Sequence, residues 1–223
     1  ENMTKDKILT QEQIIERIKK VKASSGYADG LAFGGGNLDL GGSRIKDLTL
    51  LHEVPKLKSL NLNWNQLSDL TPLAKMTHLT VLELGYNALT DLSPLAGIES
   101  LRSLSLFQNP IIDLTPLSGL VNLSKLNLMD TEVSDVAPLA GLKNLKELTL
   151  SKTLVKDVAP LVKLTSLRRL HLIECPVPED QKAMLRKALP ECDITFREKT
   201  MEEITRDLQK TTKELEKVLK ELE

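Results

Sequence analysis

A strict 22-residue period runs through most of this chain of 223 residues. The tripeptide Leu-x-Leu recurs without insertion or deletion at 60–62, 82–84, 104–106, 126–128, 148–150 and 170–172. One further step back lies Leu38-Asp39-Leu40, so the chain contains about seven units of this length. A period of this kind is typical of solenoids, in which each structural unit packs only against its two neighbours.

Alternation within each unit predicts a short strand with one buried and one exposed side. Leu60 and Leu62 would point into the core, which leaves Ser59, Asn61 and Asn63 on the outside. The apolar residues of one unit cannot offset the backbone entropy lost on ordering it, so a single unit should not fold alone. Stacked units share a continuous core, and their strands would form a parallel sheet.

Two polar series keep the same period. The first is Asn65, Asn87, Asn109, Thr131, Thr153 and Cys175, and the second is Asp47, Asp69, Asp91, Asp113, Asp135 and Asp157. We expect the first series to turn inward and to satisfy backbone groups of the neighbouring turn. The Asp series could form a calcium ladder, but carboxylates in loops more often accept hydrogen bonds from amides of their own turn.

The segment 79–89, LTVLELGYNAL, fits the pattern L-x-x-L-x-L-x-x-N-x-L, and TDLSPLAGI follows it. It resembles the leucine-rich-repeat family, in the bacterial 22-residue subclass that includes internalins, over roughly residues 35 to 175. The resemblance implies an α/β solenoid, a curved right-handed coil with a parallel β-sheet on its concave side. It also implies a bacterial protein that is secreted or attached to the cell envelope, but it identifies no partner.

The sequence divides into four segments around this repeat. We predict an N-terminal helical cap over 1–34, leucine-rich repeats over 35–175, a helix-and-strand C-terminal cap over 176–197, and an amphipathic helix over 198–223. Thr10 and Gln13 fit a capping box that opens a helix over 10–22. A second helix over 178–189 would end at Pro190, and a short strand over 192–196 would follow it.

The last segment carries apolar residues three and four apart. They are Met201, Ile204, Leu208, Thr211, Leu215, Val218 and Leu222. This heptad spacing is consistent with a helix that packs back on the repeats. It is equally consistent with a coiled coil, either with a partner or through self-association over residues 201–222.

Composition argues against several classes of function. The net charge of −1 does not favour nucleic acid, and no apolar run reaches the roughly 18 residues needed for insertion into a membrane. The glycines at 34–36 lack the Lys-Ser/Thr of a phosphate loop. Cys175 and Cys192 would lie at opposite ends of neighbouring strands, beyond disulfide reach, and His171 would face away from Cys175. We therefore predict a protein that is not an enzyme and that uses no cofactor and no metal.

The outward positions suggest a binding surface. The chain has one Trp, two Tyr and three Phe, and three of these rings, Trp64, Tyr86 and Phe107, occupy adjacent outward positions of consecutive repeats, with Met129 next. Grouped exposed rings are typical of interface hot spots. The predicted partner-binding residues are these four together with Asn61, Asn63, Glu83, Gln108, Lys125, Asp130, Lys152 and Arg169. We expect a protein–protein interaction module that binds its partner on the concave face; the alternative is an assembly protein that oligomerises through its C-terminal helix.

Overall fold

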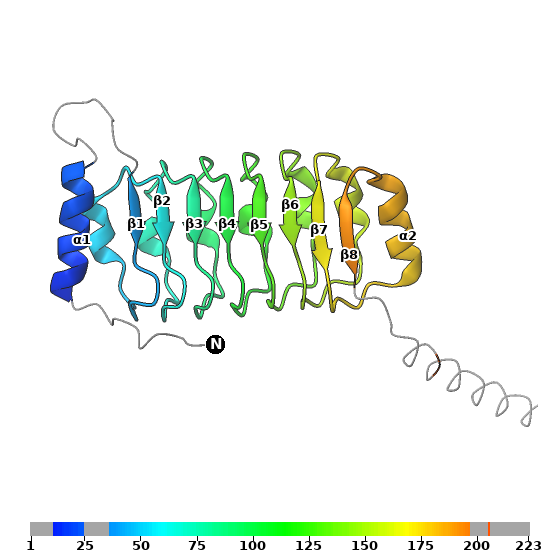
Figure 1. Cartoon of the computed structure of the whole chain (residues 1–223), viewed down its shortest axis with the longest axis horizontal. Helices are drawn as coiled ribbons and strands as arrows, with labels where there is room; N and C mark the ends of the chain where they lie inside the picture. Colours follow the sequence, from blue (N-terminus) through cyan, green and yellow to red (C-terminus); the bar gives the residue numbers. More distant parts are fainter. Residues whose placement is uncertain (1–10, 25–35, 197–204, 206–223) are drawn as a thin grey trace, which may run out of the picture.

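The computed structural model describes residues 11–24, 36–196 and 205, and within them eight strands form one parallel sheet (Figure 1). The strands are β1 (Asn37–Asp39), β2 (Ser59–Asn61), β3 (Val81–Glu83), β4 (Ser103–Ser105), β5 (Lys125–Asn127), β6 (Glu147–Thr149), β7 (Arg169–Leu172) and β8 (Asp193–Phe196). Each strand pairs with the next one along the chain. The predicted leucine-rich-repeat solenoid is confirmed.

The register of the sheet follows the sequence period up to its last strand. Leu60 pairs with Leu82, and every pair from β1 to β7 has the same 22-residue offset. The last pair differs, because Leu170 lies opposite Ile194. The additional residues between β7 and β8 form part of α2 (Glu179–Ala188), which replaces the usual return path.

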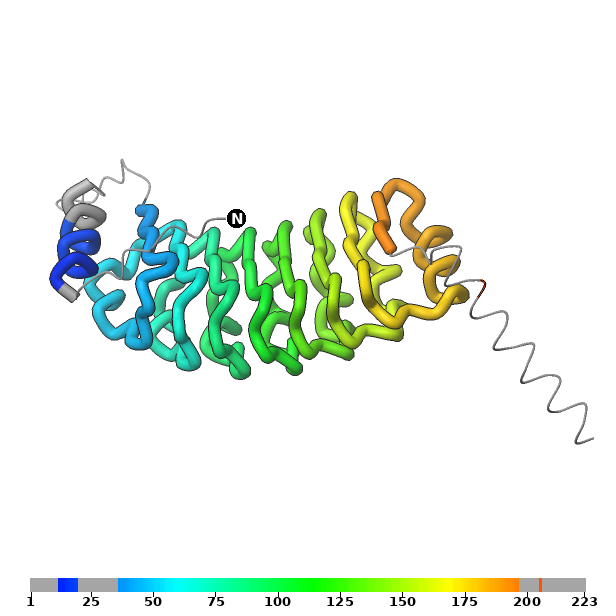
Figure 2. Tube along the Cα trace, turned by 60° about the horizontal axis from the view of Figure 1, so that its bottom comes forward, coloured from blue at the N-terminus to red at the C-terminus, as the bar shows by residue number. Residues whose placement is uncertain are grey.

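The return path of the other repeats is a 3-10 helix on the far side of the coil. These helices are η1 (Thr49–Glu53), η2 (Thr71–Leu73), η3 (Ser93–Leu95), η4 (Thr115–Leu117), η5 (Ala137–Gly141) and η6 (Ala159–Lys163). From η2 onward each has a proline in its first turn, where the missing N–H costs no hydrogen bond. Figure 2 shows that the array of repeats is bowed.

One apolar core runs the length of the coil, from Ile18 to Phe196. It consists almost entirely of Leu, Ile and Val, and Leu60, Leu82 and Leu95 are each 0% exposed. The helix α1 (Gln11–Ser24) lies against β1 and η1 at one end, and α2 lies against η6 at the other. The predicted terminal helices are thus present, and both cover open ends of the core.

Some predictions fall on residues outside the described ranges. These are the capping role of Thr10 and, apart from Thr205, the amphipathic helix over 198–223 with its proposed self-association.

The inward polar series links successive repeats by hydrogen bonds. The amide oxygen of Asn65 accepts from the N–H of Ile45 at 2.8 Å, and its nitrogen donates to the carbonyls of Leu40 and Leu62 at 3.0 and 2.9 Å. Asn87 and Asn109 repeat this arrangement one and two turns on. The expected inward orientation is confirmed, and each Asn satisfies both its own turn and the preceding one.

The change from Asn to Thr alters this network in the second half of the coil. The hydroxyl of Thr131 donates to the carbonyl of Leu128, in its own turn, at 2.7 Å. The N–H of Ile111, which an Asn at position 131 would have accepted, bonds instead to the carbonyl of Asn109 at 2.8 Å. Thr153 also bonds within its own turn, to Leu150. The amide bridges of this buried series therefore end at Asn109, whereas Cys175 links to the preceding turn through the carbonyl of Leu150.

The Asp series closes turns, as expected. In each turn the carboxylate accepts the N–H two residues on at 2.8 to 2.9 Å, as in the pair of Asp69 with Thr71. Hydrogen bonds from the hydroxyl and then the N–H of Thr71 lower the pKa of Asp69, and Thr115 does the same for Asp113.

The substitution Asn109→Ala should destabilise the protein more than Thr131→Ala. Loss of the amide leaves the buried N–H of Leu89 and the carbonyl of Leu106 unpaired and removes one of the two hydrogen bonds to the carbonyl of Leu84, which should cost about 2–4 kcal/mol. Loss of the Thr131 hydroxyl removes one bond within a turn, at about 1 kcal/mol. Chemical denaturation of the two variants measures the difference, and equal losses would show that the links between turns do not matter.

Acid should weaken the repeat body through the Asp turns. A folded-state pKa below the ordinary Asp value of about 3.9 contributes stability above that pH, and this contribution is lost as the pH falls through the folded-state pKa. The denaturant concentration at the midpoint of unfolding, measured from pH 6 to pH 2.5, should decrease once the pH is below about 4. In the double variant Asp69→Asn/Asp113→Asn the side-chain oxygen can still accept the hydrogen bond but does not titrate, so the midpoint should decrease less. An equal decrease in the variant and the unaltered protein would contradict this assignment.

Candidate protein-binding face

The three predicted rings are in contact just beyond the C-terminal ends of β2, β3 and β4. Trp64 stacks on Tyr86 with ring centroids 3.3 Å apart and planes inclined by 15°. Tyr86 meets Phe107 edge to face, with centroids 5.1 Å apart and an angle of 89°. We call Trp64, Tyr86 and Phe107 the aromatic ladder. It crosses three consecutive repeats, so residues 43 positions apart in sequence form one continuous surface.

The rings of the aromatic ladder differ in exposure. Trp64 is 46% exposed, whereas Tyr86 and Phe107 are only partly exposed. Stacking explains the difference, since Tyr86 has a ring on either side and Trp64 has one. Solvent thus reaches mainly the indole of Trp64 and, to a smaller extent, the rings of Tyr86 and Phe107.

A left-handed backbone turn presents the first two rings, a feature that the sequence reasoning missed. Trp64 and Tyr86 have φ of 59° and 54°, and Gln108, Asp130, Lys152 and Glu174 occupy the same place in later repeats with similar values. Left-handed geometry costs a non-glycine residue about 1 kcal/mol or more. From Trp64 to Lys152 each N–H in this column donates to the next repeat, as Trp64 does to the carbonyl of Gly85 at 2.9 Å. The available signal was Gly42, one period before Trp64.

Phe107 reaches the ladder because the repeat before it has a glycine. Phe107 follows Gly85 by one period, and its ring lies over that residue. A Cβ on Gly85 would stand 2.0 Å from Phe107 Cε1 and 2.3 Å from Cδ1, far inside contact distance. Gly85 has no positive φ, so this glycine serves close approach and not backbone freedom.

The predicted contacts Asn61 and Asn63 are engaged in the surface itself. Asn61 donates to the carboxylate of Asp39 at 2.9 Å and accepts the N–H of Asn63 at 3.0 Å. Asn63 in turn accepts the N–H of Gly85 at 2.6 Å. These amides fix the turn beneath the aromatic ladder. The hydrogen bond from Gly85 to Asn63 also fixes the backbone over which the Phe107 ring lies.

Beyond the ladder, Gln108 continues the column of Tyr86. Its amide nitrogen donates to Asp130 at 2.7 Å, whereas its amide oxygen is buried and has no partner among the described residues. Met129 follows Phe107 by one period and is partly exposed. The hydrogen bond of Gln108 thus links the repeat of Phe107 to the repeat of Asp130.

The C-terminal part of the face neutralises itself. Glu147 lies between Lys125 and Arg169 on adjacent strands, with Lys125 Nζ at 3.2 Å and Arg169 bonded to the same oxygen. Burial alone would raise the pKa of Glu147, but hydrogen bonds and charge from Arg169 and Lys125 outweigh it and lower that pKa. Lys125 and Arg169 are thus already paired, and of the predicted basic contacts only Lys152 is exposed without a bond within the described part of the chain.

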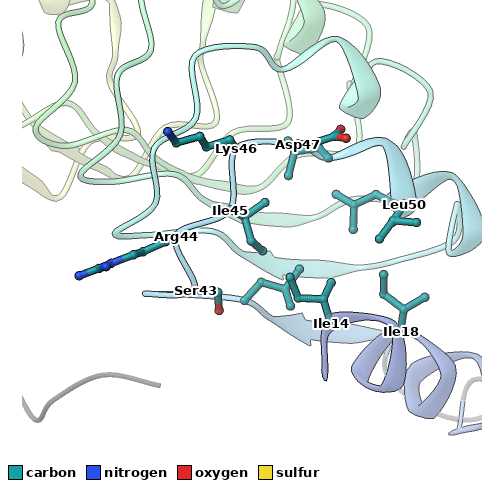
Figure 3. A pocket seen from close by; sticks show the side chains of 11 residues that line it. Ile14, Ile18, Ser43, Arg44, Ile45, Lys46, Asp47 and Leu50 are labelled. Carbon is teal, nitrogen blue, oxygen red and sulfur yellow. The ribbon is translucent and has the colours of Figure 1, made fainter. Parts of the chain in front are cut away.

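A cavity of about 310 Å³ lies away from this face, between α1 and the first repeat (Figure 3). Its lining includes the apolar residues Ile14, Ile18, Leu48 and Leu51, so it is a gap in the packing of the N-terminal cap.

Both cysteines are free thiols. Cys175 donates to the carbonyl of Leu150 at 2.9 Å, as expected for the inward series. Burial, and then the neighbouring Asp193, raise the pKa of the Cys192 thiol. Residues 11–24 and 36–196 contain no cluster of three metal-ligating side chains and no helix long and apolar enough to cross a bilayer.

Comparison with known proteins agrees with this geometry. The family model for leucine-rich repeats in two copies matches residues 55–97, 77–119 and 99–141. The internalin inlF of Listeria monocytogenes superposes with a TM-score of 0.69 at 28% identity, over 80% of this chain and 54% of that one. The chain is thus a leucine-rich-repeat solenoid that is similar to internalins.

Two further structures are similar to this internalin-like protein. The internalin C2 of Listeria monocytogenes gives a TM-score of 0.67 at 28% identity over 81% of this chain and 92% of its own. A leucine-rich-repeat protein of Leptospira interrogans gives 0.64 at 29% identity over 69% and 40%. The chain thus spans about half of inlF and less of the Leptospira protein. A search of curated protein sequences finds no significant match.

The family sets the broad class of function. The leucine-rich-repeat fold is a general protein-interaction module, and proteins built on it are typically scaffolds without enzymatic activity. The partner of this internalin-like protein must be sought in its variable outward side chains.

Gly85→Ala should disturb the aromatic ladder of this internalin-like protein. The new methyl group forces the Phe107 ring out of its position, at a cost of about 1–3 kcal/mol, and changes the near-ultraviolet circular dichroism of the rings. Gly119→Ala is the matched control, because a Cβ there meets nothing within 4 Å. In a Phe107→Ala background the cost of Gly85→Ala should largely vanish, and an undiminished cost would refute the steric role.

Proposed function

We propose that this protein binds another protein on the concave face of its solenoid, with the aromatic ladder as the anchor. The observation that carries the proposal is the grouping of Trp64, Tyr86 and Phe107, half of the aromatic residues of the chain, into one partly exposed stack. Phe196, the other aromatic residue that the structure describes, lies in the core and is 9% exposed. Exposed aromatic clusters on an otherwise polar surface are the composition of an interface hot spot.

Rigidity of the site supports this function. The hydrogen bonds of Asn61 and Asn63 hold the backbone beneath the rings, and the stack restricts the side chains. Binding of a partner would therefore cost this protein little side-chain entropy, which favours affinity. Met129 extends the apolar surface by one repeat.

Polar groups around the ladder would supply specificity. Glu83, Gln108 and Asp130 border the rings, and Lys152 stands exposed two repeats further on. Lys125 and Arg169 would contribute through the ion-pair row with Glu147, so a partner that used them would have to compete with that row.

Quantitative capture of binding proteins tests the proposal. Full-length protein, the ladder variant Trp64→Ala/Phe107→Ala and the control variant Ile112→Ala/Leu154→Ala would each serve as bait for whole-cell proteins. Ile112 and Leu154 are 61% and 58% exposed and lie outside the sheet, so the control removes comparable exposed apolar surface.

The ladder variant should lose specific partners at least ten-fold, whereas the control variant should keep them. Circular dichroism must show that both variants fold. Retention of the same partners by all three baits would refute the aromatic ladder as the anchor, and loss with both variants would indicate general adhesion through apolar surface.

A further inference from the structure

Trp64 is 46% exposed, and its ring contact among the described residues is with Tyr86 of the next repeat. The residue at the equivalent place in the preceding turn is Gly42, with φ of 65°. It has no side chain that could stack on the indole, and a Cβ there would meet no atom within 4 Å. We call the position beside Trp64 on the Gly42 side, where the stack has no further ring, the slot.

Two acidic side chains lie on the strands near this slot. Asp39 and Glu83 are the charged residues among the outward positions of β1 to β4 and the two positions after each of these strands. Asp39 accepts hydrogen bonds from neutral donors, the N–H of Gly41 and the amide of Asn61. Glu83 pairs with Asn61 in the sheet register and has no ion pair among the described residues. Two carboxylates thus lie on the strands beside Trp64 without a cation opposite them.

No cation–π contact with Trp64 is formed by the described residues. Arg17 donates to the main-chain carbonyl of Asp39, at the edge of the sheet. Cation–π contacts of the described residues involve Lys182 and Arg186 with Phe196, at the far end of the coil. Arg44 extends away from the other labelled side chains in Figure 3.

We infer that the slot beside Trp64 receives a cationic side chain, an arginine in preference to a lysine, from the partner protein. The inference rests on the proposed function and names the chemistry that the anchor would recognise. An indole face attracts a cation through the ring quadrupole, and Asp39 and Glu83 add charge complementarity. A planar guanidinium can extend the Trp64–Tyr86 stack by one layer, which a compact ammonium cannot do.

Trp64 is the only tryptophan of the chain, so its fluorescence reports on this slot directly. Full-length protein would be titrated with a capped hexa-arginine peptide and with hexa-citrulline, which keeps the shape but lacks the charge. The arginine peptide should change Trp64 emission at a concentration at least ten-fold lower than citrulline does, and added salt should weaken the effect. Equal responses to both peptides would overturn the inference.

Charge variants show whether the carboxylates of the slot are responsible. Glu83→Gln should raise the half-saturating concentration of hexa-arginine several-fold. Glu99→Gln removes the same charge from an exposed position in the turn before β4 and should change it little. Trp64→Ala, followed by the anisotropy of a labelled peptide, should weaken binding at least ten-fold. If Glu99→Gln weakens binding as much as Glu83→Gln does, the attraction is diffuse and the slot is not a site.

The two proposals fail separately. If captured partners depend on the ladder but hexa-arginine and hexa-citrulline behave alike, the binding face stands and the cationic specificity falls. If hexa-arginine binds at Trp64 but the ladder variant keeps all captured partners, the slot is a cation site and the concave face is not the partner's anchor.

Discussion

Burial of leucines between successive turns is the interaction on which the rest of the structure depends. No turn has a core of its own, so each one orders only by contributing its inward side chains to a core shared with its neighbours. Constant strand register follows from this sharing, because a shift by one residue would turn the leucines outward. The side chains that alternate with the leucines keep the same register, and so do the rings of the aromatic ladder.

Repetition makes the two sides of each strand independent. The inward side is uniform and sets the frame, whereas the outward side varies without cost to the core. Among the outward side chains, the N-terminal half thus combines three rings with two carboxylates, while the C-terminal half has an ion-pair row. The first half leaves rings and carboxylates for a partner, whereas in the second half Lys125 and Arg169 are already paired with Glu147.

Amide side chains bridge successive turns beneath the rings. Asn65, Asn87 and Asn109 each bond to their own turn and to the preceding one, whereas Thr131 bonds within its own turn. A stiff frame under an exposed anchor limits the entropy lost on binding. The position of the ladder over the bridged turns is therefore consistent with a preorganised binding face.

The sequence by itself determined the solenoid, its period, the inward leucines, the Asp turns and the placement of three rings on one side. These features depend on alternation and spacing, which are local and repeat. Only the tertiary structure showed that Trp64 stacks on Tyr86, that Phe107 needs Gly85, and that Lys125 and Arg169 share Glu147. Each of those contacts joins residues one repeat apart, and the first also depends on a left-handed turn at Trp64 and Tyr86 that most side chains avoid, so no pattern within one repeat specifies them.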